Sequence, residues 1–235
     1  RAAHRRDGRR VMFSLEQNTY KNARLGDTDF TDAELRGYTF ENCDLRGAMF
    51  SGALLEKCRF SACAFDFSRL NDVLARGCSF ENCTFNTMAY KNVKNSNPIW
   101  WRMTTKLDAV FTNCTVKSIL PVKFETPKVT PKIEITGCTF DIAKSEVYST
   151  DTRNYGVMFS SQSIDNKYGD ITLTNNKLLN ETAGLVTFYD ANTDWAEGCY
   201  LTMNGNDVKN GKVVQMYKTA KIVVKPYMKG TDFGA

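Results

Sequence analysis

The stretch from Leu15 to Tyr90 decides the fold, and its central part, residues 31–60, reads TDAELRGYTFENCDLRGAMFSGALLEKCRF. Every fifth residue of this stretch is apolar, and the residue two positions before each of them is usually small or apolar. The first series is Leu15, Tyr20, Leu25, Phe30, Leu35, Phe40, Leu45, Phe50, Leu55, Phe60, Phe65, Leu70, Ala75, Phe80, Phe85 and Tyr90; the second is Ala23, Ala33, Cys43, Ala48, Ala53, Cys58, Cys63, Ser68, Val73, Cys78 and Cys83.

A period of five residues matches neither an α-helix, which repeats its face every 3.6 residues, nor a strand, which repeats every 2. It fits a square coil with four short sides, each of which turns one central residue inward. Such a coil takes about 20 residues, and successive coils stack about 4.8 Å apart through strand-like hydrogen bonds. The coil therefore predicts that residues 20 positions apart lie in one column.

Residues at this spacing are of matching type. Phe40, Phe60 and Phe80 predict an aromatic stack in the interior. Further predicted columns are Cys43, Cys63 and Cys83, then Cys58 and Cys78, and on the outside Arg36, Glu56 and Arg76, whose charges alternate as those of cross-strand neighbours should.

Blocks such as Ala33-Glu34-Leu35, Cys43-Asp44-Leu45 and Cys83-Thr84-Phe85 resemble those of the pentapeptide-repeat family. The resemblance covers about a third of the chain and implies a right-handed quadrilateral β-helix, but it says little about function. Some members of that family imitate DNA through an acidic rod and inhibit topoisomerase. The formal net charge of +5 argues against DNA mimicry by this chain.

The second half of the chain has a longer repeat. Residues 133–140, 171–178 and 201–208 align without gaps, and each segment alternates apolar and polar residues before a turn at Gly or Asn. A second family of strands lies at 156–159, 184–188 and 212–216, in which we expect Val157, Leu185 and Val213 to be equivalent, and residues 222–224 would form a last strand.

These longer coils resemble those of pectate-lyase-like right-handed β-helices, in which a turn asparagine often stacks into a ladder. The resemblance places Cys138, Asn176 and Asn206 in the equivalent column. The 38 residues between Ile133 and Ile171 predict an excursion at 143–154, and such a loop is a place where function can be carried.

The predicted fold is therefore all-β: a continuous right-handed parallel β-helix, or solenoid, with narrow coils first and wider, irregular coils after them. The expected parts are a basic N-terminal tail at 1–12, the five-residue β-helix at 13–93, an irregular connection at 94–131, wider coils at 132–227 and a tail at 228–235. The tail contains Arg1, Arg5, Arg6, Arg9 and Arg10. Such a run more often forms a solvated tail than a nucleic-acid site, so nucleic acid is not an expected partner.

The composition limits the chemistry further. Five of the eight cysteines occupy the inward small position, where we expect free thiols in the core, although stacked neighbours leave disulfides open. There is no CxxC pair and His4 is the one histidine, so neither a zinc site nor a cofactor is expected. No run approaches 18 apolar residues, so no membrane span is expected. The chain begins with Arg1 rather than Met, which leaves processing and further domains open.

A carboxylate pair is the one enzymatic alternative. Asp190 and Asp194 lie in the wide-coil half, where two acids in a side groove could hydrolyse a glycosidic bond, with Tyr189 and Trp195 stacking on the sugar. The competing interpretation is that these acids are ordinary turn residues. A Ser-His-Asp or Cys-His site is excluded in this chain because its one histidine lies in the basic tail.

Trp100 and Trp101 follow the polar break after the narrow coils. They could form an exposed anchor for a partner. The plainer interpretation is that they cover the end of the first solenoid, which would otherwise pair with other strand edges.

The leading functional hypothesis is a non-catalytic structural or recognition β-helix that binds a protein or glycan, as part of a phage tail or tailspike-like appendage. Such a component would be made in the cytoplasm and act in the virion or outside the cell, and a homotrimer would favour this hypothesis. One alternative is the substrate-recognition domain of a secreted bacterial effector. The other is a polysaccharide-degrading β-helix enzyme that uses the carboxylate pair.

Overall fold

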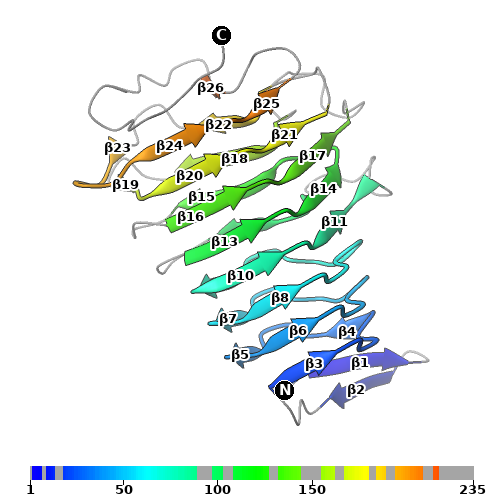
Figure 1. Cartoon of the computed structure of the whole chain (residues 1–235). Helices are drawn as coiled ribbons and strands as arrows, with labels where there is room; N and C mark the ends of the chain where they lie inside the picture. The colour runs from blue at the N-terminus through cyan, green and yellow to red at the C-terminus, as the bar shows by residue number, and fades with distance from the viewer. Residues whose placement is uncertain are drawn as a thin grey trace.

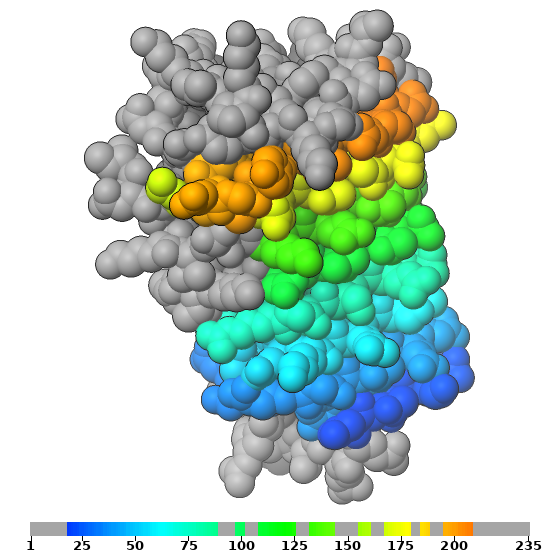
Figure 2. Space-filling view, turned by 60° about the vertical axis from the view of Figure 1, so that its left-hand side comes forward, coloured from blue at the N-terminus to red at the C-terminus, as the bar shows by residue number. Residues whose placement is uncertain are grey.

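The computed structural model describes residues 2–6, 9–13, 18–88, 97–102, 108–126, 132–143, 155–161, 167–179, 184–188, 194–208 and 214–216. These residues form a right-handed parallel β-helix whose coils climb along one axis (Figure 1). In the space-filling view the coils lie over one another as bands from blue to orange (Figure 2). No helix of the described part of the chain is long and apolar enough to cross a membrane.

The first side of the coil, wall 1, is a parallel sheet of eight strands that runs through narrow and wide coils alike. The central residue of each strand points into the core, and the residues on either side of it point outward. The strands are β3 (Thr19–Lys21), β6 (Thr39–Glu41), β8 (Arg59–Ser61), β10 (Cys78–Glu81), β13 (Asp108–Thr112), β16 (Lys132–Thr136), β20 (Ile171–Thr174) and β24 (Leu201–Asn204).

Wall 2 follows wall 1 in every coil. Single bridges at Arg24, Asp44 and Ala64 lead into β11 (Thr84–Asn86), and the sheet continues with four further strands. These strands are β14 (Thr115–Ser118), β17 (Thr139–Ile142), β21 (Lys177–Leu178) and β25 (Asp207–Val208).

Walls 3 and 4 complete the coil. Wall 3 begins with bridges at Asp29, Met49 and Arg69, and a bridge from Asn71 to Trp100 joins it to a sheet of five strands. That sheet contains β12 (Trp100–Arg102), β15 (Val122–Thr126), β18 (Val157–Ser161), β22 (Val186–Phe188) and β26 (Val214–Met216). Wall 4 contains β5 (Glu34–Arg36), β7 (Leu54–Glu56) and β9 (Leu74–Arg76) in the narrow coils, and β19 (Lys167–Tyr168) and β23 (Asp194–Trp195) in the wide ones.

The five-residue pattern is confirmed throughout the described narrow coils. Every central residue from Leu25 to Phe85 is buried, and so is nearly every small residue two positions before one. Phe60 lies between Phe40 and Phe80 with 4.9 Å between ring centroids on both sides, and Phe111 extends the stack 4.8 Å beyond Phe80. Leu15 and Tyr90, the ends of the pattern, lie outside the described residues.

The corners of the narrow coils require a left-handed backbone. The residue two positions after each central residue from Tyr20 to Phe80 has a positive φ between 51° and 71°, which residues other than glycine, asparagine and aspartate rarely adopt. At Gly47 even alanine would collide, because a Cβ there would lie 2.2 Å from Asp27 Oδ1 of the coil before. The corner residues are Asn22, Asp27, Asp32, Gly37, Asn42, Gly47, Gly52, Lys57, Ala62, Phe67, Asp72, Gly77 and Asn82.

The N-terminal segment is not the irregular tail that its composition predicts. Strands β1 (Ala2–Arg6) and β2 (Arg9–Phe13) pair as an antiparallel hairpin. Strand β1 also pairs with β4 (Thr28–Asp29), where Ala3 opposes Asp29. The hairpin thus closes the strand edge that wall 3 would otherwise leave unpaired at this end.

The segment expected to be an irregular connection, 94–131, contains four wall strands. Strands β12 to β15 enter walls 3, 1, 2 and 3 in turn, so the solenoid continues through this segment. Phe80 pairs with Phe111, 31 residues later instead of 20, which marks the first wide coil.

The three aligned segments of the second half are confirmed as adjacent coils. Ile133 pairs with Ile171, and Ile171 pairs with Leu201. In wall 3 the register differs by one residue from the expected one, because Val157 pairs with Val186 rather than Leu185, and Val186 with Val214 rather than Val213. A one-residue slip turns every side chain to the other face of the sheet, and the observed register keeps Phe159 and Phe188 stacked in the core.

Candidate recognition surface

The predicted carboxylate pair is not assembled by the described residues. Tyr189 and Asp190 lie outside them, and so do the excursion at 144–154 and residues 222–224. Asp194 belongs to β23, where its backbone pairs with Lys167. The polysaccharide-degrading alternative therefore stays a prediction.

The two adjacent tryptophans of β12 have different environments, because neighbouring residues of a strand point to opposite faces. Trp101 is 0% exposed, and its ring lies 5.7 Å from those of Phe111 and Phe124. It fills the first wide coil and cannot reach a partner at the surface. Trp100 lies on the outer face, where the Lys123 ammonium is 4.9 Å from its ring centroid.

Trp195, proposed for sugar stacking, also belongs to the core. It is 2% exposed and lies 4.9 Å from the ring of Tyr168 and 5.4 Å from that of Phe188. Because wall 4 of the wide coils is built from β19 and β23, its inward side chains must fill the larger cross-section. Of the four aromatic residues proposed for binding, Trp100 is the one whose described side chain lies at the outer surface.

One column of polar side chains runs beside the corner between walls 1 and 2. Each Cys thiol in it donates to a carbonyl of the preceding coil, as Cys63 does to Phe40 O at 3.3 Å and Cys114 to Phe80 O at 3.4 Å. Asn176 continues the column, donating from Nδ2 to Ile135 O at 2.9 Å. The members of the column are Cys43, Cys63, Cys83, Cys114, Cys138, Asn176 and Asn206.

The predicted equivalence of Cys138, Asn176 and Asn206 is thereby confirmed. The Cys138 N–H donates to Asn176 Oδ1 at 2.9 Å, and the Asn176 N–H donates to Asn206 Oδ1 at 3.0 Å. The cysteine and asparagine side chains satisfy the same backbone carbonyls, so this column holds neighbouring coils together.

The buried thiols are not placed as nucleophiles. All eight cysteines are free, and seven are buried. The neighbouring Cys114 thiol and burial raise the pKa of Cys138, so its thiol stays protonated at neutral pH. Within the described residues, no three His, Cys, Asp or Glu side chains are grouped so as to hold a metal ion.

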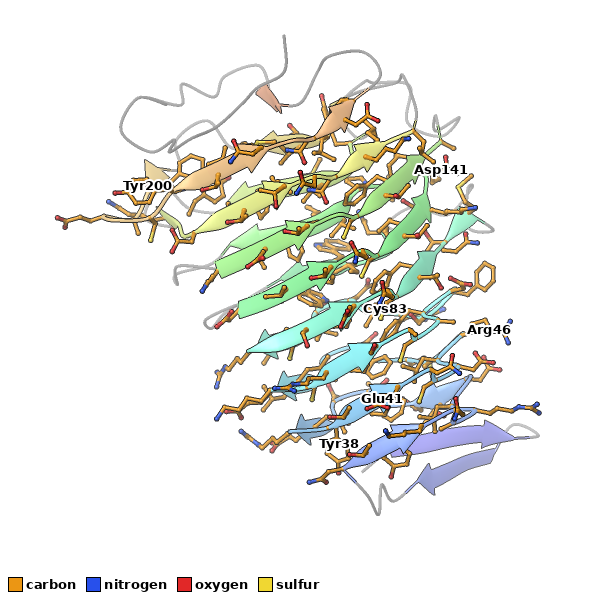
Figure 3. All side chains as sticks on the ribbon, viewed as in Figure 1. Tyr38, Glu41, Arg46, Cys83, Asp141 and Tyr200 are labelled. Carbon is orange, nitrogen blue, oxygen red and sulfur yellow. The ribbon has the colours of Figure 1, made fainter. Side chains whose placement is uncertain are left out.

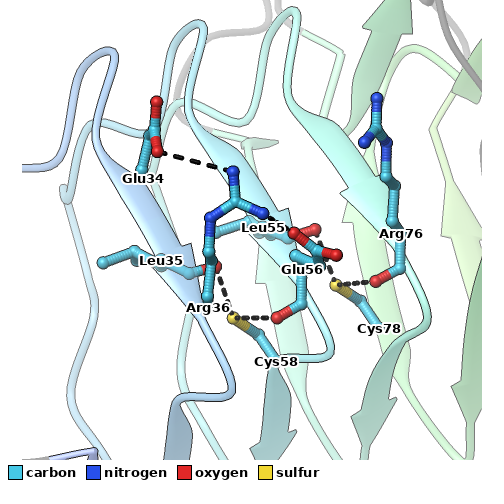
Figure 4. Close-up of polar contacts among 8 residues, drawn as sticks. All are labelled: Glu34, Leu35, Arg36, Leu55, Glu56, Cys58, Arg76 and Cys78. Atoms are coloured by element: carbon cyan, nitrogen blue, oxygen red, sulfur yellow. Dashed lines mark hydrogen bonds and ion pairs between the residues drawn. The ribbon is translucent and has the colours of Figure 1, made fainter.

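The outer surface of the coils carries ion pairs along its columns. Lys21 Nζ lies 2.7 Å from Glu41 Oε2, and Arg36 pairs with both Glu34 and Glu56 (Figure 4). The alternating column predicted for Arg36 and Glu56 is thus present. These pairs are exposed to solvent, so each contributes little to stability, about 0–1 kcal/mol.

A groove of about 640 Å³ crosses the corner between walls 2 and 3 in the narrow coils. Arg46, which projects from this side of the rod in Figure 3, pairs with Asp44 at its rim: Nε lies 2.8 Å from Oδ1 and Nη2 lies 2.6 Å from Oδ2. The same guanidinium lowers the pKa of Asp44. The side chains that line the groove are Asp27, Asp44, Arg46, Met49, Phe67 and Arg69.

Phe67 is an unusual residue for this position. It is a corner residue with φ of 60°, and it is the one aromatic among the described corners. Its side chain is 36% exposed. A bulky residue in the left-handed region costs about 1–2 kcal/mol, so the phenyl ring is present despite a backbone penalty. The sequence signal was available, since Phe67 stands two positions after Phe65.

Comparisons with known proteins bear on the narrow coils. Residues 23–61 match the family model of pentapeptide repeats, with 8 copies. A comparison with curated proteins found no match. Among solved structures, the chain is similar to full-length QnrB1, a plasmid-mediated fluoroquinolone resistance protein, with 17% identity over 85% of this chain and 82% of that chain, at a TM-score of 0.36. A trypsin-treated form of QnrB1 is similar at 16% identity over 85% and 90%, at a TM-score of 0.22.

The predicted pentapeptide repeats are therefore present in residues 23–61. The low TM-scores mean that the two QnrB1 structures superpose poorly on this chain, and the fold assignment rests on its own repeat and strand registers. No comparison bears on the pectate-lyase-like character of the wider coils, which stays a prediction.

Proposed function

We propose that this chain, whose residues 23–61 are pentapeptide repeats of a β-helix, is a non-catalytic recognition protein that binds a protein partner along the sides of its rod. The observation that carries the proposal is the filled interior. Large rings such as Phe60, Trp101 and Phe188 occupy the coils, each 0–1% exposed. The chemistry offered to other molecules therefore lies on the outer walls.

The outer walls suit recognition because they are rigid and regular. Coils held by parallel pairing present their outward side chains in straight columns, about 4.8 Å apart. Such a surface is organised before binding, which lowers the entropy cost of association.

A crosslinking experiment tests this proposal. A photo-crosslinking amino acid is placed at one exposed position on each wall, Glu81, Lys117, Arg69 and Glu34, in the full chain in its producing cells. We expect one protein to be captured repeatedly from one wall, and a probe at buried Phe60 to capture none. Capture from no wall, or release of reducing ends from a polysaccharide by the purified chain, would contradict the proposal.

The hypothesis that the chain is part of a phage tail or tailspike-like appendage concerns its oligomeric assembly and is tested separately. No described contact and no comparison supports a phage tail or tailspike role, a trimer or a glycan partner. Light scattering coupled to size exclusion decides it: a stable trimer would support the spike hypothesis, and a monomer would count against it.

A further inference from the structure

Two large apolar side chains are exposed in the described part of the chain, and they lie on opposite sides of the rod. Phe67 is 36% exposed at the corner between walls 2 and 3, and Tyr200 is 38% exposed at the corner between walls 4 and 1. Figure 3 shows Tyr200 at one edge of the rod and Arg46, which lines the groove beside Phe67, at the opposite edge. The large apolar side chains that a partner could cover are therefore confined to these two sites.

The groove at Phe67 has room for an inserted aromatic ring. Its corner column contains Asp27, Gly47 and Phe67 in successive coils, so that Asp27 and Phe67 lie two coil spacings, about 10 Å, apart along the axis. Gly47 carries no side chain between them, and half-exposed Met49 also lines the groove. The volume of about 640 Å³ is in the range of sites that enclose small molecules, about 300–1,000 Å³. An aromatic side chain that enters here contacts Met49 and the ring of Phe67.

The corner that carries Tyr200 is a tight turn with a fixed backbone. Gly198 has a φ of 74°, and the Cys199 N–H donates to Ala196 O at 3.0 Å. The Tyr200 N–H donates to Asp170 Oδ1 of the preceding coil at 3.0 Å. These bonds hold the backbone at and before Tyr200, so the entropy cost of inserting its ring into a partner is low.

The charges beside the two sites are of both signs and match each other. Asp27 and Arg69 in the groove are exposed and have no ion pair among the described residues, which leaves one carboxylate and one guanidinium available. Lys167 and Glu197, near the Tyr200 corner, are likewise exposed and without a described ion pair. Each surface therefore offers one cation and one anion to the other.

We propose that the groove of one copy of this chain receives Tyr200 of a second copy, which covers both exposed apolar sites. In this contact Lys167 of the second copy faces Asp27, and its Glu197 faces Arg69. The second copy supplies the apolar ring and the pair of charges that the groove lacks. The inference goes beyond the proposed function and is independent of the partner protein proposed there.

The positions of the two sites determine the kind of assembly. Because the sites lie at opposite corners, two copies cannot exchange both contacts, and every pair keeps one groove and one Tyr200 for further copies. Along wall 1, five strand spacings separate β8, in the coil of Phe67, from β24, in the coil of Tyr200. Copies with parallel axes are therefore offset by about 24 Å, and a heterologous contact of this kind extends into an open filament.

Light scattering of the full chain at rising concentration tests the inference. We expect the mass of the wild-type chain to grow past that of a dimer, and to fall again on dilution because so small a contact binds weakly. Phe67→Asn, which suits the left-handed corner, and Tyr200→Ser should each keep the chain at its single mass of 26.6 kDa. An equimolar mixture of these two variants should form a dimer and stop there, because each pair contains one intact groove and one intact Tyr200.

A charge exchange tests the orientation of the contact. Arg69→Glu should weaken association about tenfold, and adding Glu197→Arg to the same chain should restore it. Arg59→Gln, at an exposed arginine of wall 1 outside both sites, should associate as the wild-type chain does. Circular dichroism checks that each variant folds, and the charge exchange still decides if Phe67→Asn does not. A wild-type chain that stays monomeric, a mixture of folded variants that forms no dimer, or a charge exchange without recovery would overturn the inference.

Discussion

The narrow and wide coils differ in size, yet they share one part without change. From wall 1 to wall 2 the central residues stay five apart in every coil: 20 and 25, 40 and 45, 60 and 65, 80 and 85, 111 and 116, 135 and 140, 173 and 178, 203 and 208. All the added residues enter at the other corners. The lesson is that a solenoid can widen while one corner keeps the five-residue unit.

The reason for this constancy lies in the corner between walls 1 and 2. Its left-handed residue persists into the wide coils as Asn113, Gly137, Asn175 and Gly205. The hydrogen-bonded column of cysteine and asparagine follows it at the next position. A corner that is held by side-chain bonds from Cys43 to Asn206 tolerates no insertion, whereas the described residues of the other corners form no such column through the wide coils.

The largest difference between the two regions should appear on removing a core ring. We expect Phe60→Ala to cost about 3–5 kcal/mol, because Phe60 stacks between two rings in a coil too narrow to collapse around the cavity. Phe188→Ala in a wide coil near the end of the described solenoid should instead uncouple those coils from the rest. Urea unfolding followed by circular dichroism measures both; identical single transitions would show that the regions unfold as one unit.

The shared column can be tested by exchanging its residues. Asn176→Ala should cost about 2–3 kcal/mol, because it leaves the Cys138 N–H and the Ile135 carbonyl buried without partners. Asn176→Cys should recover part of that loss by extending the cysteine column. Thermal unfolding of the three proteins gives the comparison, and no recovery by cysteine would mean that the two side chains are not equivalent.

Corner sterics should distinguish glycines that look alike in sequence. Gly47→Ala should cost about 2 kcal/mol, because left-handed strain adds to the collision with Asp27 Oδ1. Gly37→Ala should cost about 1 kcal/mol, since nothing lies within 4 Å of its added Cβ and only the strain remains. Chemical denaturation measures each. In a chain that already carries Asp27→Ala, Gly47→Ala should cost only about 1 kcal/mol, so that the difference between the two glycines disappears; its persistence would reject the steric explanation.

The buried thiols of the two regions should resist modification alike, despite their different coils. Native protein should expose one reactive thiol to Ellman's reagent, that of Cys199, which is the partly exposed cysteine, and denatured protein should expose all 8. The hydrogen bond with Cys114, together with burial, raises the pKa of Cys138, and burial raises the pKa of Cys199, above the unfolded value of about 8.5; the stability that these two thiols contribute is therefore complete below pH 8.5 and falls as the pH rises beyond it. More than one rapidly labelled thiol in native protein would contradict the buried column.

The smallest effect should come from an ion pair on wall 4. Arg36→Gln removes the partner of Glu56 and should cost about 0.2–1 kcal/mol, because both groups are exposed and screened by salt. The loss should shrink at 1 M salt. Thermal melts at both salt concentrations measure it, and a loss above about 2 kcal/mol would require a buried role for the pair.

Much of the fold could be predicted because the five-residue period names the inward positions directly. The same period placed Phe60 in a stack, and the longer repeat of the second half placed Ile133 beside Ile171. The wall 3 register failed because the sequence shows Val157, Leu185 and Val213 at an even spacing, while the stacking of Phe159 on Phe188 sets a different one. The hairpin was missed because its composition resembles a solvated tail, although Asp7-Gly8 between its strands is a turn signal.

The candidate site was harder to predict than the fold. The sequence indicated one common role for Trp100 and Trp101. In the structure they lie in one strand, so Trp101 points inward and Trp100 points outward. The groove depends on the size of the residue at each corner: Phe67 is large, whereas the equivalent corner residues of the preceding coils, Asp27 and Gly47, are smaller. The sequence alone does not bring Met49, Phe67 and Arg69 together until the 20-residue coil is applied to all three.

The unbroken corner also limits how such a chain can evolve. Inserting five residues into a narrow coil would move every later residue to the next side, so that the cysteines and asparagines would leave their common column. Inserting one complete coil would change only the length of the rod. Gene duplications should therefore survive in whole turns, each adding about 4.8 Å. The length of the solenoid can therefore change by whole coils, while the columns of side chains on its four walls keep their order.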